Sequence, residues 1–600
     1  ILRTVTHAFA TRRGDLLAVA GAETGKILAE GDVEVSEAID FAAWYVDRAE
    51  ELEGVDGAQF VPPRVTVVTP PWNFALSITA GSTLAALAAG SSVLLKPAPQ
   101  ARHCAAVISE CLWEAGIPRD VLQLVDVEEN EAGKHLVSHP EVDRVILTGA
   151  WETAKLFRSW RHDLPVLAET SGKNSIIVTE NADYDLAAAD IIKSAFGNAG
   201  QKCSAASLII LVGQAYRSQR LRHQILDAAS SIRVGSPSDL RSQMGPLAEP
   251  ASGKLLDGLT KLDPGQEWAL EPVRIDEEGR YWSPGVRSGI KPGDPYHLTE
   301  YFGPITGIMY APDLATAIAY QNGTAFGLTA GLHSLDPAEI EFWAERANAG
   351  NLYVNRSITG AIVGRQPFGG WKRSAVGPGA KAGGYHYLQV LGTWRRAEVS
   401  APTPADRPCA LVEQFVGHIE GLVTRDERAW LLDAVARDAR EWDEWFGRSI
   451  DVGGLEKERN ILRYRPASTQ VRGCADAKLV DVARVVAAGL LAAGDNISVC
   501  LDPSLGEGLG RALRSVGVAV TTASDEDWYA SLGASRVRLV GGNPSRAADE
   551  ADGDPDLALW ANEVTSAPQV ELLPFLREQS VSMTAHRFGN PDAGVLSVRL

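Results

Sequence analysis

The sequence predicts an α/β fold, because short buried strands alternate with helices in both the first and the last part of the chain. Residues 65–68 read as a buried β-branched strand, and a helix of small residues follows at 80–85. Strand and helix alternate again between residues 480 and 540. Alternation of this kind is typical of a sheet covered by helices. We therefore expect more than one α/β layer in this chain.

Length and composition limit the function classes that can apply. At 600 residues the chain has room for roughly four compact units. No apolar run approaches the about 18 to 20 residues that cross a bilayer, and residues 1–4 lead into a helical segment rather than a signal peptide. The net charge of −19 disfavours nucleic acid as a partner. Six unclustered cysteines without Cys-x-x-Cys spacing predict a cytoplasmic protein and no metal site.

Cys203 and Glu169 are the candidate catalytic pair. Cys203 stands in a Gln-x-Cys-Ser stretch, downstream of the Glu-Thr-Ser-Gly-Lys-Asn stretch that begins at Glu169. A cysteine attacks an aldehyde carbon only as its thiolate, and the thioester that results is released only when a positioned base activates water. Each residue alone is a weak signal, because most cysteines are inert small hydrophobes and a lone Glu before a small-residue turn usually lies on the surface.

Asn73 is the third candidate catalytic residue, in the motif Thr-Pro-Pro-Trp-Asn-Phe at 69–74. Its alternative role is a turn Asn that caps the next helix. This motif, Glu169 and Cys203 occur in an order that resembles the aldehyde dehydrogenases. The resemblance implies that Asn73 donates to the oxyanion formed when Cys203 attacks, beside the backbone amide of Cys203 itself. Loss of one such donor typically costs about 10² to 10³ in rate.

The same resemblance implies NAD as the cofactor and assigns four residues to it. Lys96 would contact the adenosine ribose. Gly149 would let a helix N-terminus approach the pyrophosphate, although Ala150 stands where the family commonly has Ser or Thr, so that backbone amides must hold the phosphate. Glu300 would bind the nicotinamide ribose hydroxyls, and Phe302 would pack near the ring.

A second glycine-rich stretch, at residues 506–511, partly resembles a dinucleotide-binding fingerprint. It follows an apolar stretch at 497–501, as such a fingerprint should. Arg511 occupies the place of the third glycine, which close packing of the helix on the strand requires. We therefore predict no dinucleotide site there.

The substrate class is indicated by residues 351–370, which resemble the L-glutamate γ-semialdehyde (1-pyrroline-5-carboxylate) dehydrogenases, particularly the second half of bifunctional proline utilisation enzymes. The resemblance implies that the backbone of a Thr-Gly-Ala turn anchors the substrate α-carboxylate and that two phenylalanines enclose its aliphatic middle. The expected substrate-binding residues are Lys202, Ser204, Gly360, Ala361, Phe74 and Phe368. The alternative for Phe368 is core packing. Glu37 either lines the substrate region or belongs to a solvated helical face.

The resemblance covers about residues 1 to 395 and suggests how the chain is divided. The expected units are an N-terminally incomplete NAD-binding domain at 1–170, a catalytic domain at 171–365, a return and anchor segment at 366–400, a linker at 401–408 and a structural α/β domain at 409–600. The last unit resembles the degenerate aldehyde dehydrogenase cofactor domain of long-form proline utilisation enzymes. Its terminal stretch at 577–590 is similar to the flap strand of that domain.

The expected activity is therefore NAD-dependent oxidation of L-glutamate γ-semialdehyde to L-glutamate through a cysteine thiohemiacetal and thioester. Two alternatives stay open: a dehydrogenase of another ω-semialdehyde, and a non-catalytic assembly module. The resemblance also implies a homo-oligomer and a covalent upstream proline dehydrogenase, because the family normally carries a further N-terminal segment. None of the residues of a flavin site are in this sequence.

Overall fold

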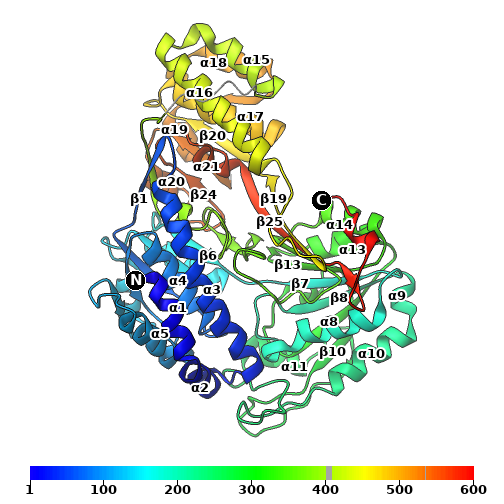
Figure 1. Cartoon of the computed structure of the whole chain (residues 1–600). Helices are drawn as coiled ribbons and strands as arrows, with labels where there is room; N and C mark the ends of the chain where they lie inside the picture. The colour runs from blue at the N-terminus through cyan, green and yellow to red at the C-terminus, as the bar shows by residue number, and fades with distance from the viewer. Residues whose placement is uncertain (401–407, 534) are drawn as a thin grey trace.

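The structure is a computed structural model of the chain that describes residues 1–400, 408–533 and 535–600. The described strands form three large sheets of six, ten and five strands, which confirms the predicted α/β class. Helices from the N-terminus cover one side of the body, and the five-stranded sheet lies in a separate upper unit (Figure 1). The predicted linker at 401–408 lies outside the described residues, except for Pro408.

The six-stranded sheet has the order β16-β6-β5-β2-β3-β4 and is parallel except for β16. Its strands are β2 (Val65–Thr69), β3 (Ser92–Leu95), β4 (Leu122–Leu124), β5 (Arg144–Thr148), β6 (Val166–Glu169) and β16 (Ala375–Val376). Alternate residues of β2 enter different apolar clusters, because Val68 packs with Leu84 and Ile108 whereas Val67 packs with Phe157. Helices therefore cover both faces, as in a doubly wound sheet.

The helices of this first part and of the catalytic part follow the alternation that the sequence predicts. The helices up to the six-stranded sheet are α1 (Leu2–Thr11), α2 (Arg13–Thr24), α3 (Leu28–Glu53), α4 (Ser77–Ala88), α5 (Arg102–Glu114), α6 (Glu131–Ser138) and α7 (Trp151–Trp160). The next are α8 (Tyr184–Phe196), α9 (Gln214–Arg217), α10 (Gln219–Ser230), α11 (Gly253–Thr260), α12 (Pro295–Leu298), α13 (Leu314–Asn322) and α14 (Pro337–Arg346).

The ten-stranded sheet has the order β18-β19-β25-β14-β13-β7-β8-β11-β10-β9. Its strands are β7 (Asn174–Val178), β8 (Ala206–Val212), β9 (Glu267–Leu270), β10 (Gly285–Ile290), β11 (Ile305–Ala311), β13 (Thr329–His333), β14 (Asn351–Val354), β18 (Ile450–Asp451), β19 (Glu458–Pro466) and β25 (Leu576–Thr584). From β10 to β25 every neighbouring pair is parallel. The central strands are buried runs such as Ile176 to Val178, which parallel sheets covered on both faces require.

Two long strands join the upper unit to this sheet. β19 and β25 pair in antiparallel register from Glu458↔Thr584 to Pro466↔Leu576, and β25 pairs in parallel with β14. Figure 1 shows both strands running from the upper unit into the body. Ile461, Val581 and Met583 belong to the same apolar core as Ile176. Strands that follow the predicted linker therefore complete the sheet formed by residues before it.

The upper unit is built on a parallel sheet of order β22-β21-β20-β23-β24. Its strands are β20 (Thr469–Gly473), β21 (Ile497–Leu501), β22 (Ala519–Thr522), β23 (Arg536–Val540) and β24 (Ala558–Trp560). Its helices, with the last helix of the chain, are α15 (Ala410–Ile419), α16 (Arg425–Glu441), α17 (Leu479–Ala493), α18 (Glu507–Ser515), α19 (Asp525–Ala530), α20 (Pro544–Glu550), α21 (Pro568–Glu571) and α22 (Ala593–Leu596). A buried pair, Arg484 with Asp438 at 2.6 Å, ties α17 to α16.

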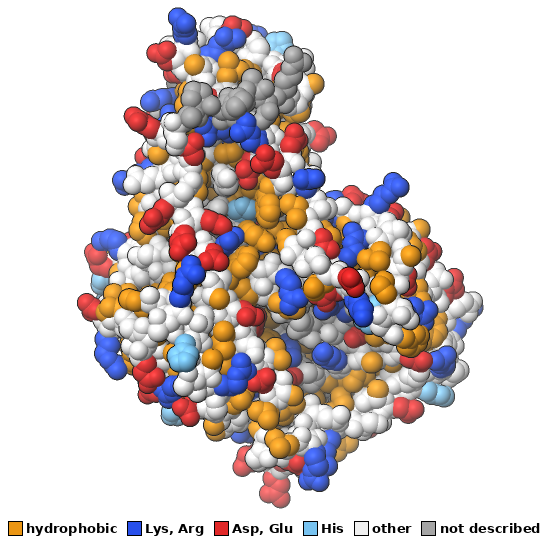
Figure 2. Space-filling model, viewed as in Figure 1, with side chains coloured by type: hydrophobic (Ala, Val, Ile, Leu, Met, Phe, Trp, Pro, Cys, Tyr) orange, Lys and Arg blue, Asp and Glu red, His pale blue; other side chains and the backbone are white. Residues whose placement is uncertain are grey.

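Short ladders complete the fold. They pair β1 (Ala58–Val61) with β17 (Thr393–Arg396), β12 (Phe326–Gly327) with β15 (Trp371–Lys372), and β26 (His586–Arg587) with β27 (Asn590–Pro591). Apolar side chains gather where the upper unit meets the body, whereas charged side chains are spread over the rest of the face shown (Figure 2). No helix in the described parts of the chain is long and apolar enough to span a membrane.

Candidate active site

The sequence-predicted residues meet around a cavity of about 880 Å³. Its wall is formed by α3, the carboxyl ends of β2, β5 and β6, the loop before β8, and residues 300–302 and 357–368. The predicted residues that line it are Cys203, Glu169, Asn73, Gly149, Glu300, Phe302, Lys202, Ser204, Gly360, Ala361, Phe74 and Phe368. Lys96 is outside the lining. It lies just beyond the carboxyl end of β3, where its Nζ atom is 3.0 Å from Glu129.

Cys203 is held by a tightly folded loop between α8 and β8. Asn198 and Ala199 both have φ of 53°, in the left-handed region that non-glycine residues rarely adopt. A Cβ atom on Gly200 would collide with the carbonyl of Gly303, so the loop packs directly against the segment that carries Glu300. Strained backbone of this kind persists only where the surrounding structure fixes it, and it is common at active sites.

The carbonyl of Cys203 is fixed from the neighbouring strand. It accepts a hydrogen bond of 2.7 Å from Asn174 Nδ2, and Asn174 Oδ1 accepts one of 3.0 Å from the backbone of Thr329. Burial raises the pKa of the Cys203 thiol to about 12, and the carboxylates of Glu300 and Glu169 add to the shift. Cys203 is therefore a protonated thiol at neutral pH in this cavity, and its attack on a carbonyl needs a proton acceptor.

Glu169 has the environment of a general base. It ends β6, and its Oε1 atom is buried without a hydrogen-bond partner in the described structure. Burial raises the pKa of Glu169 to about 8, while the charge of Lys381 opposes the shift. A carboxyl group with a pKa near neutrality and an unpartnered oxygen is suited to take and return a proton.

Asn73 has a donor available for a developing oxyanion. One hydrogen of its amide donates to the carbonyl of Gln201 at 3.0 Å, which leaves the second hydrogen of the same nitrogen for another acceptor. The backbone carbonyl of Asn73 accepts a bond of 2.6 Å from Lys26 Nζ. Lys26 in turn pairs with Glu34, and both side chains are buried. These contacts fix the position of Asn73. No motif in the sequence pointed to Lys26 or Glu34 as part of the site.

One end of the cavity has the features of a dinucleotide site. Gly149 and Ala150 precede α7, and Ala150 offers no side-chain cap to the first turn, so the N-terminal amides of this ten-residue helix can bind an anion. Glu300 Oε1 accepts a bond of 3.0 Å from the backbone of Gly172. Phe302, with φ of 60°, packs edge-on against Trp72.

Lys173 is a buried residue at this end that the sequence reading did not single out. Its Nζ atom has no hydrogen-bond partner in the described structure and lies 4.2 Å over the ring of Tyr296. Burial lowers the pKa of Lys173 to about 7, and the carboxylate of Glu300 opposes the shift. A charge close to Glu300 helps keep that carboxylate ionised. In the sequence, Lys173 could have been found from its position in the motif that begins at Glu169.

The far end of the cavity carries the Thr-Gly-Ala turn. The carbonyl of Gly360 accepts a bond of 2.9 Å from the hydroxyl of Tyr353, and a Cβ atom on Gly360 would meet no atom within 4 Å. Lys202 Nζ lies 3.3 Å from Glu30 and 6.0 Å from the Phe74 ring centroid. A charged group, an apolar wall and open backbone therefore face the same space.

Glu37 lines the cavity from α3 and is half-buried. The structure therefore favours its predicted position in the substrate region over a solvated helical face. Burial raises the pKa of Glu37 to about 7, although the Ser77 hydroxyl opposes the shift. In the described residues no group of three or more His, Cys, Asp or Glu side chains is arranged to hold a metal ion.

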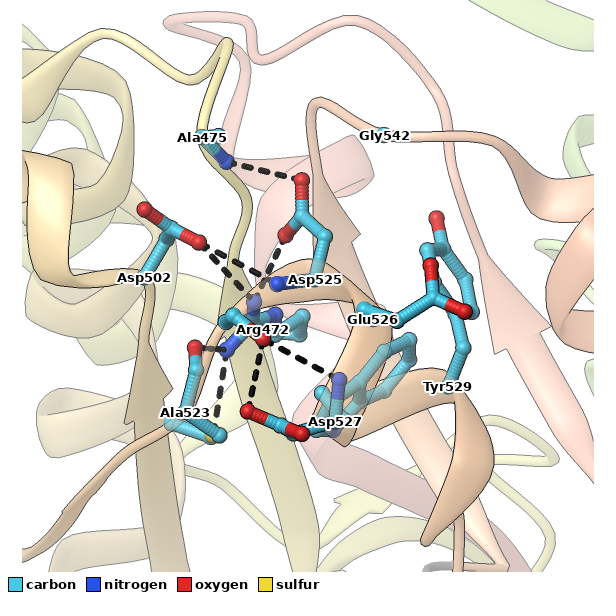
Figure 3. A network of polar contacts seen from close by, with 12 residues as sticks. Arg472, Ala475, Asp502, Ala523, Asp525, Glu526, Asp527, Tyr529 and Gly542 are labelled. Carbon is cyan, nitrogen blue, oxygen red and sulfur yellow. Dashed lines mark hydrogen bonds and ion pairs between the residues drawn. The ribbon is translucent and has the colours of Figure 1, made fainter.

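A second polar cluster lies at the carboxyl ends of the upper sheet (Figure 3). Arg472 is fully buried there and contacts Asp525 at 2.6 Å and the carbonyl of Ala523 at 3.0 Å. A Cβ atom on Gly542 would lie 2.6 Å from Cys474 Sγ and 2.8 Å from the hydroxyl of Tyr529. Side chains therefore fill the crevice between β20 and β23, where a doubly wound sheet usually binds its ligand.

The glycine-rich stretch near this cluster forms the start of α18. Gly506 precedes the helix, and Arg511 lies on its exposed face in an ion pair of 3.2 Å with Glu507. The arginine that replaces the third glycine is thus a surface residue. The fingerprint is therefore incomplete in the structure as in the sequence, and the absence of a dinucleotide site there stays a prediction.

Residues 1–393 match the aldehyde dehydrogenase family. The chain is 35% identical over 398 residues to a 1-pyrroline-5-carboxylate dehydrogenase of Geobacillus sp. (strain WCH70), covering 63% of this chain and 76% of the relative. It is 34% identical over 399 residues to 1-pyrroline-5-carboxylate dehydrogenase 2 of Bacillus subtilis, with the same two coverages.

Among solved structures, proline utilization A (PutA) from Corynebacterium freiburgense is similar over 98% of this chain, with 41% identity and a TM-score of 0.85. The chain spans only 57% of that protein. A Thermus 1-pyrroline-5-carboxylate dehydrogenase with bound NAD is similar over 66% of this chain and 80% of its own, with 31% identity and a TM-score of 0.60. These likenesses confirm the predicted aldehyde dehydrogenase fold.

Proposed function

The chain belongs to the aldehyde dehydrogenase family, and we propose that it oxidises L-glutamate γ-semialdehyde to L-glutamate with NAD. The observation that carries this proposal is the single cavity that joins Cys203 and Glu169 to the turn at 359–361. The names of the relatives and of the PutA neighbours support the choice of aldehyde.

Chemistry begins at Cys203. The thiol proton passes to solvent, and the Sγ atom of the thiolate forms a bond to the aldehyde carbon. The aldehyde oxygen becomes an oxyanion, which the second amide hydrogen of Asn73 and the backbone amide of Cys203 stabilise. When bound, NAD supplies the acceptor for the hydride that leaves this carbon. The product of the step is a thioester on Cys203.

Hydrolysis of the thioester is the task of Glu169. Its carboxylate takes a proton from a water molecule, and the oxygen of that water bonds to the thioester carbon. The bond between carbon and Sγ then breaks, the electron pair returns to sulfur, and L-glutamate is released. The raised pKa of Glu169, about 8, makes this step dependent on pH in the neutral to alkaline range.

Recognition of the substrate is assigned to the far end of the cavity. The backbone amides at Gly360 and Ala361 would bind the α-carboxylate, with polar contacts from Lys202 and Ser204. Phe74 and Phe368 would enclose the methylene groups between carboxylate and aldehyde. Two aromatic walls and a backbone anchor suit a short chain with one charged end.

The cofactor residues are assigned in the same way. Gly149 and the uncapped start of α7 would hold the pyrophosphate, Glu300 would bind the nicotinamide ribose and Phe302 would pack near the ring. Lys96 would contact the adenosine ribose. Because Lys96 lies outside the cavity lining and close to Glu129, we expect it to act at the outer edge of the site.

We further infer that this activity operates with a proline dehydrogenase half in the same protein and in a homo-oligomer. The likeness to PutA structures, one of them described as bifunctional, supports the first point. All six cysteines are free thiols, which suits the cytoplasmic location that the sequence predicts.

The test compares NADH formation by the whole chain with two aldehydes. L-glutamate γ-semialdehyde should be used with a kcat/KM at least about tenfold above that of succinic semialdehyde, which is one carbon shorter and lacks the amino group. A preference for succinic semialdehyde would support the alternative of another ω-semialdehyde. Absence of NADH with every aldehyde tried would support the non-catalytic alternative.

A further inference from the structure

Glu578 is a buried carboxylate that reaches the active-site body from the C-terminal strand β25. Its Oε2 atom accepts a hydrogen bond of 3.1 Å from the backbone amide of Lys381. Its Oε1 atom lies 3.1 Å from His386 Nδ1 and 3.2 Å from the hydroxyl of Tyr464. Although burial opposes ionisation, the hydrogen bond from His386 and the charges of His386 and Lys381 hold the pKa of Glu578 below its usual value.

Lys381 is the residue through which Glu578 acts on the cavity. Its side chain is buried, and Nζ donates to Asn351 Oδ1 at 2.8 Å and to the carbonyl of Gly369 at 2.7 Å. Both of its partners on Nζ are neutral. Burial lowers the pKa of Lys381, and the carboxylates of Glu578 and Glu169 oppose the shift by favouring the charged amine. Loss of either carboxylate would therefore favour the neutral amine.

Glu169 is the group whose proton affinity depends on this lysine. After burial, the charge of Lys381 is the largest influence on the pKa of Glu169, and it lowers that pKa. The next residue, Ala382, lines the same cavity as Glu169. Ala382 also pairs with Phe368 through two backbone bonds of 3.0 and 2.7 Å, which fixes the segment behind the base. The other charged side chain that acts on Glu169 is Glu37, which raises its pKa.

We propose that Glu578 is a positioning residue for the general base: from β25 it fixes Lys381 and keeps a positive charge behind Glu169. The proposal rests on the proposed function, because it takes Glu169 as the base that hydrolyses the thioester. The C-terminal part of the chain thereby contributes to the rate of the reaction, in addition to covering apolar surface.

Loss of the Glu578 charge should move the pH dependence of thioester hydrolysis to higher pH. Removing the charge of Glu578 favours neutral Lys381, which removes the positive charge that stabilises the ionised form of Glu169. The pKa of Glu169 then rises, and the rate of hydrolysis reaches its plateau at higher pH. A shift of about one pH unit corresponds to a roughly tenfold lower rate below the midpoint and an unchanged rate on the plateau.

The experiment uses the whole chain with the substitution Glu578→Gln, and Ser580→Ala as a matched control. Ser580 lies on the same strand and loses one buried hydrogen bond, of 2.9 Å to the carbonyl of Pro367, without a change of charge. Glu578→Asp keeps the charge and serves as the rescue variant. Lys381→Gln removes the positive charge itself. This variant keeps the proposal testable if Glu578→Gln does not fold.

The readout is hydrolysis of p-nitrophenyl acetate over a range of pH, because this activated ester should acylate Cys203 without NAD or semialdehyde. The nitrophenolate burst reports acylation, and the following steady rate reports hydrolysis by Glu169. In Glu578→Gln and Lys381→Gln the midpoint of the steady rate should move about one unit upward, with the burst amplitude unchanged. Glu578→Asp and Ser580→Ala should keep the midpoint of the unmodified chain.

An unchanged midpoint in Glu578→Gln, or an equal loss of burst and steady rate at every pH, would overturn the proposal and leave β25 a structural element. The same variants are then assayed for NADH formation with L-glutamate γ-semialdehyde. A shifted ester midpoint without any semialdehyde oxidation would refute the proposed function and keep the role of Glu578. Semialdehyde oxidation without a shifted ester midpoint would support the proposed function and refute the role of Glu578.

Discussion

The carboxylate of Glu458 lies 3.2 Å from the guanidinium of Arg356, an ion pair that joins strand β19 to the chain leading into the Thr-Gly-Ala turn. The same carboxylate lies 3.8 Å from Arg365, on the other side of that turn. One residue of the C-terminal part therefore holds both ends of the loop assigned to the substrate carboxylate. About a fifth of each of the Glu458 and Arg356 side chains is exposed, so that solvent screens the pair only in part.

Glu458→Gln should raise the KM for L-glutamate γ-semialdehyde by about tenfold and leave kcat for propanal unchanged, because only the larger substrate uses the loop. The measurement is steady-state NADH formation with both aldehydes. Glu345→Gln is the control, because it breaks a comparable ion pair of 2.7 Å to Arg465 on the same strand. Equal changes in the two variants would mean that Glu458 only stabilises the fold.

Cys203→Ala should lower turnover by at least about a thousandfold, because its thiol is the group that we propose bonds to the aldehyde carbon. NAD affinity should stay within a fewfold of its original value, since the thiol has no assigned contact with the cofactor. The measurements are steady-state NADH production and NAD titration. Residual turnover within about tenfold of the unmodified chain would show that the nucleophile is another residue.

Glu169→Gln should slow thioester hydrolysis while a first-turnover burst of NADH survives. In the unmodified chain the steady rate should rise with pH through about 8, because Glu169 acts when it is deprotonated and its folded pKa is raised to that value. The Gln variant should lack this rise. Glu37→Gln, which removes a neighbouring carboxylate, should keep the rise and move its midpoint downward. Loss of burst and steady rate together would indicate a structural carboxylate.

The motifs that carry the three candidate catalytic residues could be recognised in the sequence because each motif is local. Cys203, Glu169 and Asn73 stand in short stretches at strand ends, and residue type with order along the chain was enough to place them around one cavity. Lys96 shows what local motifs leave out. Its position at the end of a strand was predicted, but a strand end alone does not show whether the side chain lines the cavity, and Lys96 lies outside the lining.

Residues that support the site from a distance could not be found in the same way. Glu458 and Glu578 lie on β19 and β25, which enter the catalytic sheet from beyond the predicted linker. Hydrophobic alternation predicts that a strand exists but does not say which strand it pairs with. The sequence therefore suggested a separate structural unit from residue 409, whereas the strands of that unit also reach the catalytic core.

Gly360→Val should raise the KM for the semialdehyde by about 10- to 100-fold and change little for propanal, because a branched side chain would occupy the space at the carboxylate anchor. The fold should tolerate the change, since a Cβ atom at this position meets no atom within 4 Å. Gly360→Ala should give a smaller effect in the same direction. A parallel loss with both aldehydes, at unchanged NAD affinity, would show that the turn does not bind the carboxylate.

Truncation after Arg396 should destabilise the catalytic part itself, because it removes β19 and β25 and leaves β14 as an edge strand. The core around Ile176 would lose Val581 and Met583, and an unpaired buried edge promotes association with other chains. Light scattering should show aggregation, and the melting temperature should fall relative to the whole chain. A monodisperse fragment with an unchanged melting temperature and undiminished aldehyde oxidation would contradict both this expectation and the support assigned to Glu458.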